Sequence, residues 1–252
     1  MKTVTVGQVT FGVGRPKIIL PLTGRDRQEL LEQCDRLALL PGQVAEWRMD
    51  WYDRWSDLSD LLETARLIRR RLNTMPLLAT FRTAREGGEG EISMEDYYQL
   101  IAAVAESGQA DLIDIEAFSG CPAVEELVGL CHEKGVAVVL SNHDFFATPP
   151  EEEIFRRLAE MARLGADLPK IALMPQGPED VLALLSATAR ARRELDRPVI
   201  TMSMGPMGVI SRLSGQLFGS AATFGSPGRA SAPGQVEAAE LDRLLRLLSE
   251  RQ

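Results

Sequence analysis

The chain has 252 residues, of which 45% are hydrophobic and 25% charged, and this length suits one large domain or two small ones. Its formal net charge of -8 argues against a nucleic-acid-binding protein with an extended basic surface. Cys34, Cys121 and Cys131 show no CxxC spacing. The N-terminal segment lacks the apolar core of a signal peptide, and no apolar run reaches the roughly 20 residues that span a bilayer. We therefore expect a cytoplasmic protein with reduced cysteines, folded as a single domain over residues 1–252.

Strand-like and helix-like segments alternate along almost the whole chain. Residues 1–15, which include TVTV and QVTF, predict a hairpin. Eight later segments predict strands, at residues 17–22, 44–51, 76–83, 111–118, 137–144, 170–175, 198–205 and 221–226. Amphipathic segments with apolar residues at helical spacing lie between and after them, for example at residues 26–40, 58–72, 151–165, 179–195 and 233–252.

This alternation indicates the fold class. Eight strands, each followed by a helix, in about 250 residues are typical of the (β/α)8 barrel, an α/β fold also called the TIM barrel. A doubly wound open sheet is the alternative, but it normally carries a glycine fingerprint, and GVGRPK at residues 12–17 lacks the third glycine. An antiparallel sheet with one face in water would alternate in the same way, but the intervening helices favour parallel crossovers.

Polar and large apolar side chains alternate along the predicted strands. The polar face carries Glu46, Arg48, Asp50, Thr80, Arg82, Asp114, Glu116, Ser141, His143 and Lys170. The opposite face carries Trp47, Met49, Trp51, Phe81, Ile113, Ile115, Leu140, Ile171 and Leu173. In a barrel the apolar set should pack against the helices, so the polar set should face the interior. Buried charges cost free energy unless they are paired or used, and we therefore expect a functional site there.

Lys170 lies in the apolar stretch LPKIALMP. Burial and neighbouring cations favour the neutral amine, which attacks carbonyl groups and forms an imine. The alternative is a structural ion pair with a buried carboxylate such as Glu116. Lys170 begins its predicted strand, whereas barrel sites lie at the carboxyl ends of the strands. A strand that begins earlier, or a long side-chain reach, would remove this conflict.

His143 falls at the carboxyl end of a predicted strand, and an imidazole suits proton transfer near neutral pH. Glu86, in the glycine-rich loop FRTAREGGEGE, could orient that imidazole, although such loops are more often solvated turns. Arg48, Arg82 and Arg212 could together bind a carboxylate through forked hydrogen bonds. Residues 226–235 are rich in glycine, serine, alanine and proline, a composition that suits a mobile lid as well as a linker.

Seven stretches together resemble the type I 3-dehydroquinate dehydratases: EWRMD, TFRTAREGGE, SNHDF, PKIALMP, ITMSMGPMGVISRL, FGSAATFG and ASAPGQ. The similarity covers nearly the whole chain. It implies a (β/α)8 barrel whose N-terminal hairpin closes the bottom, a homodimer, no metal or organic cofactor, and no nucleic-acid or membrane partner. It further implies the dehydration of the anionic small molecule 3-dehydroquinate to 3-dehydroshikimate by syn elimination of water, the third step of the shikimate pathway toward chorismate and aromatic amino acids.

The resemblance also implies a role for each matching residue. Lys170 corresponds to the lysine that forms the imine, His143 to the general acid and base, and Glu86 to the carboxylate partner of the histidine. Arg212 corresponds to the principal ligand of the substrate carboxylate. The remaining implied substrate contacts are Glu46, Arg48, Arg82, Ser231 and Gln235 for polar groups, and Met202 and Phe224 as apolar walls.

Three rival functions share part of this pattern. Another lysine-imine barrel enzyme, such as a class I aldolase, would share Lys170. A metal-dependent barrel enzyme would use Glu46, Asp50, Asp114, Glu116 and His143, but arginines on the same faces oppose it. A non-catalytic sensor of quinate-like anions would require the loss of Lys170 or His143, and both are present. The departures from the family, Gly205 with Pro206 and Pro227 with Gly228, lie away from the matched residues and bear on the rate.

Overall fold

The computed structural model describes residues 3–118, 123–228 and 232–249, and eight parallel strands form its centre. They are β3 (Lys17–Leu22), β4 (Val44–Arg48), β5 (Leu77–Thr80), β6 (Leu112–Glu116), β7 (Ala137–Asp144), β8 (Leu168–Leu173), β9 (Ile200–Ser203) and β10 (Ala222–Ser226). From β3 to β9 each strand pairs in parallel with the next, and β10 pairs in parallel with β3. A bridge between Val199 and Ser220 joins the segments just before β9 and β10. The sheet therefore curls into a barrel, and the prediction of a (β/α)8 fold is confirmed.

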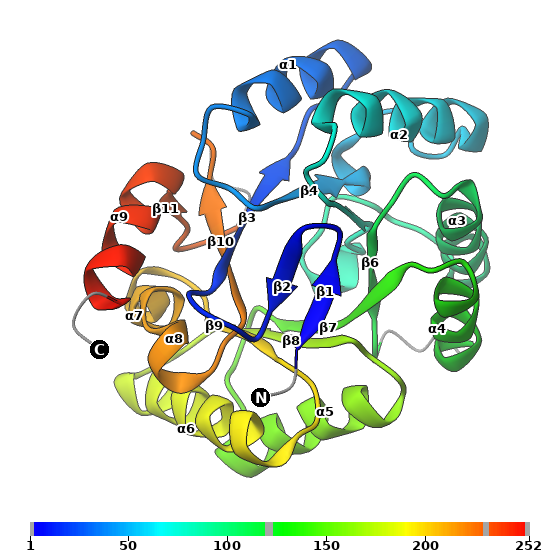
Figure 1. The fold of residues 1–252 in the computed structure, drawn as a ribbon. Coiled ribbons are helices and arrows are strands. Elements are labelled where there is room, and N and C mark those ends of the chain that lie inside the picture. Colours follow the sequence, from blue (N-terminus) through cyan, green and yellow to red (C-terminus); the bar gives the residue numbers. More distant parts are fainter. Residues whose placement is uncertain (1–2, 119–122, 229–231, 250–252) are drawn as a thin grey trace.

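Helices surround the barrel and follow the strands in chain order (Figure 1). They are α1 (Arg27–Leu37), α2 (Leu58–Leu72), α3 (Met94–Ser107), α4 (Val124–Glu133), α5 (Glu151–Arg163), α6 (Pro178–Glu194), α7 (Val209–Leu213), α8 (Gly215–Phe218) and α9 (Ala238–Ser249). Short polar residues fix the start of three of them, because the side chains of Asp26, Asp57 and Ser93 accept a hydrogen bond from an otherwise unpaired backbone N–H of the first turn.

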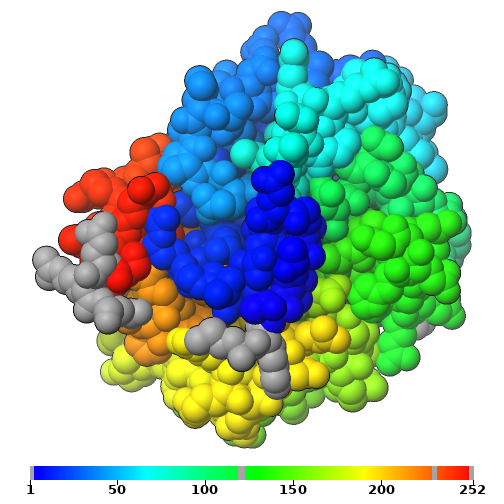
Figure 2. Space-filling view, in the orientation of Figure 1, coloured from blue at the N-terminus to red at the C-terminus, as the bar shows by residue number. Residues whose placement is uncertain are grey.

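The N-terminal hairpin closes one end of the barrel. Its strands β1 (Val4–Val6) and β2 (Val9–Phe11) are antiparallel, and they lie across the centre of the ring of helices (Figure 1). The same residues cover the middle of this face in the space-filling view (Figure 2). Val6, Val9 and Phe11 are buried against the first inward-facing residues of the strands, such as Val44 and Leu112. Because the hairpin fills the N-terminal end, only the carboxyl ends of the strands are left for a site inside the barrel.

The alternation of the strands separates two cores. Outward-facing residues, among them Trp47, Ile113, Leu140 and Ile171, pack against the helices in one large cluster. Inside, an apolar layer near the hairpin gives way to polar side chains toward the carboxyl ends, including Arg82 with 4% of its surface exposed. The prediction that the charged residues face the interior is therefore confirmed.

Six of the eight predicted strands differ in their bounds from the observed ones, and two of these differences bear on the site. β8 begins at Leu168, so Lys170 is its third residue and lies inside the barrel; the conflict over its position is thereby removed. β4 ends at Arg48, where the predicted strand ran on to Trp51, and a single 3-10 turn (Met49–Trp51) follows. The expected outward position of Trp51 is wrong, because the turn breaks the alternation and places Trp51 at the edge of the central cavity.

Two further observations concern the described part of the chain. No helix in it is long and apolar enough to cross a membrane. Cys34 and Cys131 are free and buried, and burial raises the pKa of each thiol to about 12, which makes both unreactive at neutral pH. Cys121 lies outside the described residues.

Candidate active site

A cavity of about 160 Å³ opens at the carboxyl ends of the barrel strands. Ten of the eleven residues predicted for the site line it: Glu46, Arg48, Arg82, Glu86, His143, Lys170, Met202, Arg212, Phe224 and Gln235. The eleventh, Ser231, lies outside the described residues. The sequence therefore predicted the place of the cavity and most of its lining.

Lys170 stands inside the barrel with 4% of its surface exposed. Its Nζ lies 3.0 Å from Oδ2 of Asp114 on the facing part of β6, and 4.9 Å from the centre of the Phe224 ring. The predicted alternative, a buried ion pair, is therefore present, but with Asp114 and not with the suggested Glu116. An ammonium group held in this way is positioned between an anion and an aromatic face, both of which stabilise a cation.

Asp114 belongs to a network that also includes Arg82. Its Oδ1 accepts hydrogen bonds from Nη2 of Arg82 at 2.7 Å and from Oγ of Ser141 at 2.6 Å. Burial alone would raise the pKa of this carboxyl group, but the charges of Arg82 and Lys170 outweigh it and lower the pKa to about 2. Nη1 of Arg82 donates to Glu116 at 3.0 Å. Asp114 is therefore a permanent anion near neutral pH.

Glu86 and His143 form a hydrogen-bonded pair at the rim of the barrel. Oε2 of Glu86 lies 2.8 Å from Nδ1 of His143 and also accepts the backbone N–H of the same residue at 3.0 Å. Nε2 of His143 has no hydrogen-bond partner among the described residues, and the side chain lines the cavity. The pair thus points one ring nitrogen at the carboxylate and leaves the other for a ligand.

The electrostatic surroundings perturb both members of this pair. Burial raises the pKa of Glu86 to about 7, and Glu116 acts in the same direction, while Arg82 opposes them. Burial lowers the pKa of His143 well below its usual value, and the nearby Arg82 and Lys170 add to this effect. The imidazole is therefore neutral at physiological pH, which is the form that accepts a proton.

Arg212, on α7, is the cation of the cavity that lacks a carboxylate partner within the described part of the chain. Its side chain is buried, Nη2 donates to the carbonyl oxygen of Pro233 at 3.0 Å, and Nε makes no hydrogen bond there. Burial without a counter-charge lowers the pKa of Arg212 to about 10. A buried guanidinium with an unused N–H group is suited to bind an anionic ligand.

The expected cluster of three arginines is only partly present. All three line the cavity, but Arg48 donates to both oxygens of Asp50, at 2.8 and 2.7 Å, and Arg82 is held by Asp114 and Glu116. The guanidinium groups of Arg48 and Arg82 are already paired, because the turn after β4 supplies Asp50 and β6 supplies Asp114 and Glu116. Arg212 alone remains for the carboxylate of a ligand, as judged from the described residues.

The segment predicted as a lid, residues 226–235, reaches the cavity from one side. Pro233 and Gln235 line it, together with Ala232. The backbone N–H of Gly205 donates to the carbonyl oxygen of Pro233 at 3.3 Å, so this part of the segment is anchored to the loop after β9. Residues 229–231 lie outside the described residues.

Sequence reasoning missed several residues of the lining, among them Trp51, Glu89, Phe145 and Met204. Phe145 comes just after the predicted strand at residues 137–144, and Met204 lies near the end of the predicted strand at residues 198–205, so closeness to a strand end was the available signal. Glu89 belongs to the loop that contains Glu86. Trp51 could not be found by alternation, because the strand before it ends early.

Metal ligation has little support in the part of the chain that the structure describes. No group of three or more His, Cys, Asp or Glu side chains there is placed to hold a metal ion. Three of the four carboxylates proposed for such a site are engaged by cations: Asp50 by Arg48, and Asp114 and Glu116 by Arg82.

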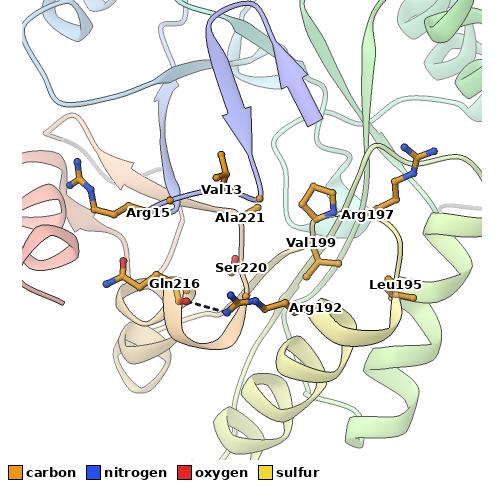
Figure 3. A pocket seen from close by; sticks show the side chains of 14 residues that line it. Val13, Arg15, Arg192, Leu195, Arg197, Val199, Gln216, Ser220 and Ala221 are labelled. Atoms are coloured by element: carbon orange, nitrogen blue, oxygen red, sulfur yellow. Dashed lines mark hydrogen bonds between the residues drawn. The ribbon is translucent and has the colours of Figure 1, made fainter. Parts of the chain in front are cut away.

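A second cavity, of about 120 Å³, lies at the opposite end of the barrel (Figure 3). Its lining includes Arg15, Arg192 and Arg197. However, Arg15 pairs with Asp242, Arg192 donates to the carbonyl oxygen of Gln216, and Figure 3 shows Arg15 and Arg197 pointing away from Arg192 on opposite sides. The three cations do not converge, so this cavity is not comparable to the site at the carboxyl ends of the strands.

A parallel barrel with titratable side chains gathered in a cavity at the carboxyl ends of its strands defines the class of this protein, a (β/α)8-barrel enzyme. The sequence model of the family described as Type I 3-dehydroquinase matches residues 18–252. The chain therefore belongs to the type I 3-dehydroquinases.

Individual relatives agree with this family. A 3-dehydroquinate dehydratase from Syntrophotalea carbinolica is 49% identical over 249 residues, which are 98% of each chain, and one from Bacillus licheniformis is 48% identical over 248 residues. One similar solved structure is the type I 3-dehydroquinate dehydratase of Clostridium difficile, which is described with covalently modified comenic acid. It is 44% identical with a TM-score of 0.96, and the match covers 100% of this chain and 99% of that one. The Geobacillus kaustophilus enzyme is 37% identical with a TM-score of 0.96, covering 99% and 97%.

Proposed function

We propose that the protein converts 3-dehydroquinate to 3-dehydroshikimate through an imine between Lys170 and the C3 ketone of the substrate. Its family makes the chain a 3-dehydroquinate dehydratase, a hydro-lyase of the shikimate pathway. The observation that carries the proposed mechanism is the presence of Lys170 and the Glu86–His143 pair in one cavity. Lys170 lies on β8 and His143 on the adjacent β7, so both side chains can reach one bound molecule.

The proposed reaction begins with attack of the neutral amine of Lys170 on the C3 carbonyl carbon. Loss of water gives an imine, which becomes a cation when it is protonated. The iminium withdraws electrons from the adjacent C2, so that Nε2 of His143 can remove a C2 proton and leave an enamine. The enamine then expels the C1 hydroxyl, which leaves as water with a proton returned by His143 on the same face, a syn elimination. Hydrolysis of the imine releases the product and restores the amine, and the net change is the loss of one water.

Asp114 and Glu86 have separate electrostatic roles in this scheme. Asp114 is anionic and lies 3.0 Å from Nζ of Lys170, so it stabilises both the ammonium of the free enzyme and the iminium of the intermediate. Ionised Glu86 accepts the Nδ1–H of His143, which leaves Nε2 as the basic nitrogen. Protonated Glu86 would be a weaker acceptor and would be able to donate its O–H to Nδ1 instead, and we therefore expect the ionised form to be the active one.

Binding of the substrate would rest mainly on Arg212. Its guanidinium, which pairs with no carboxylate among the described residues, would receive the carboxylate of 3-dehydroquinate. The ring hydroxyls would meet polar groups of Glu46, Arg48, Arg82 and Gln235. Met202 and Phe224 would supply the apolar walls. Ser231 is proposed as a contact from the closing segment on the basis of the family alone. Closure of that segment would exclude water that hydrolyses the imine.

Reduction by borohydride tests the imine directly. Intact mass spectrometry is performed on the wild-type protein and on Lys170→Ala, each with and without 3-dehydroquinate and borohydride. A substrate-dependent covalent adduct on the wild type, absent from the variant, is expected. If the wild type gives no adduct yet forms the conjugated enone of the product, the imine is wrong and dehydration is non-covalent. An adduct without enone would favour the aldolase-like alternative.

A further inference from the structure

Glu86 is connected to the outer helix α5 through the side-chain amide of Asn142. Nδ2 of Asn142 donates to Oε1 of Glu86 at 3.2 Å. Oδ1 of the same amide accepts from Nη1 of Arg157 at 3.0 Å. Arg157 is in turn fixed by Glu153, one turn earlier on α5, whose Oε1 accepts its Nε–H at 2.8 Å. A continuous chain of hydrogen bonds thus runs from the site to the outside of the barrel.

The chemistry of Arg157 determines which way the amide of Asn142 can point. A guanidinium only donates hydrogen bonds, so it requires the oxygen of the amide and turns the amide nitrogen toward Glu86. Asn142 is buried, with 8% of its surface exposed, so water does not readily replace either partner. An amide nitrogen aimed at a carboxyl group stabilises the ionised carboxylate, whereas an amide oxygen aimed at it stabilises the protonated acid.

We propose that Arg157 is a positioning residue for the dehydration, acting through Asn142 to hold Glu86 in the ionised form that orients His143. This inference rests on the proposed function of the site. Arg157 lies on α5, outside the barrel, and does not line the cavity, so its effect on the reaction would be entirely indirect.

The charges around Glu86 nearly balance, so the orientation of the Asn142 amide can decide whether Glu86 is ionised. Glu116 and Asp114, on β6, disfavour the ionisation of Glu86. Arg82, just after β5, lies 3.4 Å from Glu86 and favours its ionisation. His143, on β7, donates a hydrogen bond to Glu86. These effects leave the pKa of Glu86 at about 7, so both forms are populated near neutral pH. Without Arg157 the amide is free to turn, and its oxygen can then accept a hydrogen bond from the protonated acid.

The test compares Arg157→Met with Arg156→Met. The two arginines are neighbours on α5 and both bind Glu153, but only Arg157 reaches Asn142. In Arg157→Met the acidic midpoint of the kcat–pH profile should rise by about 0.5–1 pH unit, so that kcat falls about three- to tenfold at pH 6 and less than about twofold at pH 8.5. Arg156→Met should leave the profile unchanged. Arg157→Lys keeps a donor and should retain most of the wild-type midpoint.

A double-mutant cycle shows whether Arg157 acts through Asn142. In an Asn142→Ala background the midpoint should already be raised, and adding Arg157→Met should move it no further. The proposal would be overturned if the two substitutions shifted the midpoint additively, or if Arg156→Met shifted it as much as Arg157→Met. It would also be overturned if Arg157→Met lowered kcat equally at every pH together with the melting temperature.

A measurement without substrate separates this inference from the proposed function. The carboxyl carbon of Glu86 is titrated by NMR in the wild type, Arg157→Met and Arg156→Met. A raised midpoint in Arg157→Met alone supports the hydrogen-bonded link even if the wild type proves to have no dehydratase activity. Identical midpoints in all three proteins would overturn the link even if borohydride traps the imine.

Discussion

Lys170 and Asp114 form a buried ion pair, with Nζ of the lysine 3.0 Å from Oδ2 of the aspartate. The side chain of Asp114 has no exposed surface, and its other oxygen is held by Arg82. In the proposed mechanism Lys170 must lose its proton before it attacks the ketone, yet it lies beside an anion that stabilises its protonated form. The iminium proposed as the product of that attack would also be a cation at nearly the same position, so Asp114 would stabilise it too.

Asp114→Asn should be costly both for folding and for catalysis. It removes the charge that compensates two buried cations, and breaking a buried pair in this way typically costs about 3–5 kcal/mol. The free energy of unfolding, measured with urea, should fall by about that amount, and the yield of borohydride-trapped imine should fall as well. Asp242→Asn is the control, because Asp242 pairs with the partly exposed Arg15 and should cost less than about 1 kcal/mol. Equal losses in the two variants would contradict the argument.

The carboxylate of Asp114 should also make the stability of the folded protein sensitive to acid. The pKa of Asp114 is about 2 in the folded state, below the usual value of 3.8. A carboxyl group whose pKa is depressed by folding stabilises the protein above its unfolded-state pKa, and this contribution is lost as the pH falls through the folded-state pKa. We expect about 2 kcal/mol to disappear between pH 4 and pH 2. Urea unfolding across this range should show a loss that is about 2 kcal/mol larger in the wild type than in Asp114→Asn.

Arg212→Met should weaken substrate binding while it stabilises the free protein. The substrate carboxylate would lose its principal cation, and a charge-assisted hydrogen-bonded pair is worth about 2–4 kcal/mol, so KM should rise about 30- to 1000-fold. In the free protein Arg212 is a buried cation without a carboxylate partner among the described residues, and its pKa is lowered to about 10. Replacing it with an apolar side chain should therefore raise the free energy of unfolding by about 1–3 kcal/mol. An unchanged KM would show that the carboxylate binds elsewhere.

Much of the barrel could be predicted because its signals are local. The period-two alternation that puts Glu46 and Arg48 inside and Trp47 outside depends only on strand geometry, and the helices between the strands require parallel connections. Lys170 was placed correctly in the interior for the same reason. The family resemblance then gave the individual roles, which alternation cannot supply.

The remaining features depend on contacts between distant parts of the chain. No local pattern indicates that Asp114, and not Glu116, pairs with Lys170, because the choice depends on the register between β6, β7 and β8. Nor does a count of arginines reveal that Arg82 is already bound by carboxylates. Trp51 was misplaced because alternation cannot show where a strand ends.

Glu86→Gln should stabilise the folded protein at alkaline pH and not at acidic pH. The folded-state pKa of Glu86 is about 7, above the usual value of 4.5. Ionisation therefore opposes folding: the penalty is absent below pH 4.5, grows as the pH rises to 7, and stays constant above it. Glutamine avoids the charge, so the free energy of unfolding should rise by about 1–3 kcal/mol at pH 8 and change little at pH 4.5. Urea unfolding at both pH values measures this.

The exposed neighbour Glu89 provides the matched control for that experiment. It belongs to the same loop, and Glu89→Gln removes an equal charge from the surface. It should leave the free energy of unfolding unchanged at both pH values. The activity of Glu86→Gln should fall as its stability rises, because a neutral amide no longer holds His143 as a base. If the difference in free energy of unfolding between Glu86→Gln and the wild type is the same at pH 8 as at pH 4.5, the raised pKa of Glu86 is refuted.

Gly234→Ala should disturb the contact between the predicted lid and Arg212. Gly234 has a φ of +77°, and a Cβ there would lie 2.4 Å from the carbonyl oxygen of Gly205. The segment would have to move away, and the carbonyl oxygen of Pro233, which now accepts from Arg212 at 3.0 Å, would move with it. Arg212 would then be less well positioned for the substrate carboxylate, so KM should rise about tenfold or more.

Gly228→Ala separates this contact from simple backbone strain. Gly228 lies in the same segment and also has a positive φ, of +139°, but a Cβ there would meet nothing within 4 Å. Both substitutions strain the backbone, whereas only Gly234→Ala forces the segment away from Gly205. Steady-state kinetics should therefore show a much larger rise in KM for Gly234→Ala. Equal effects would mean that backbone strain, and not the contact with Gly205, controls binding, and the anchoring of the segment would then have no part in holding Arg212.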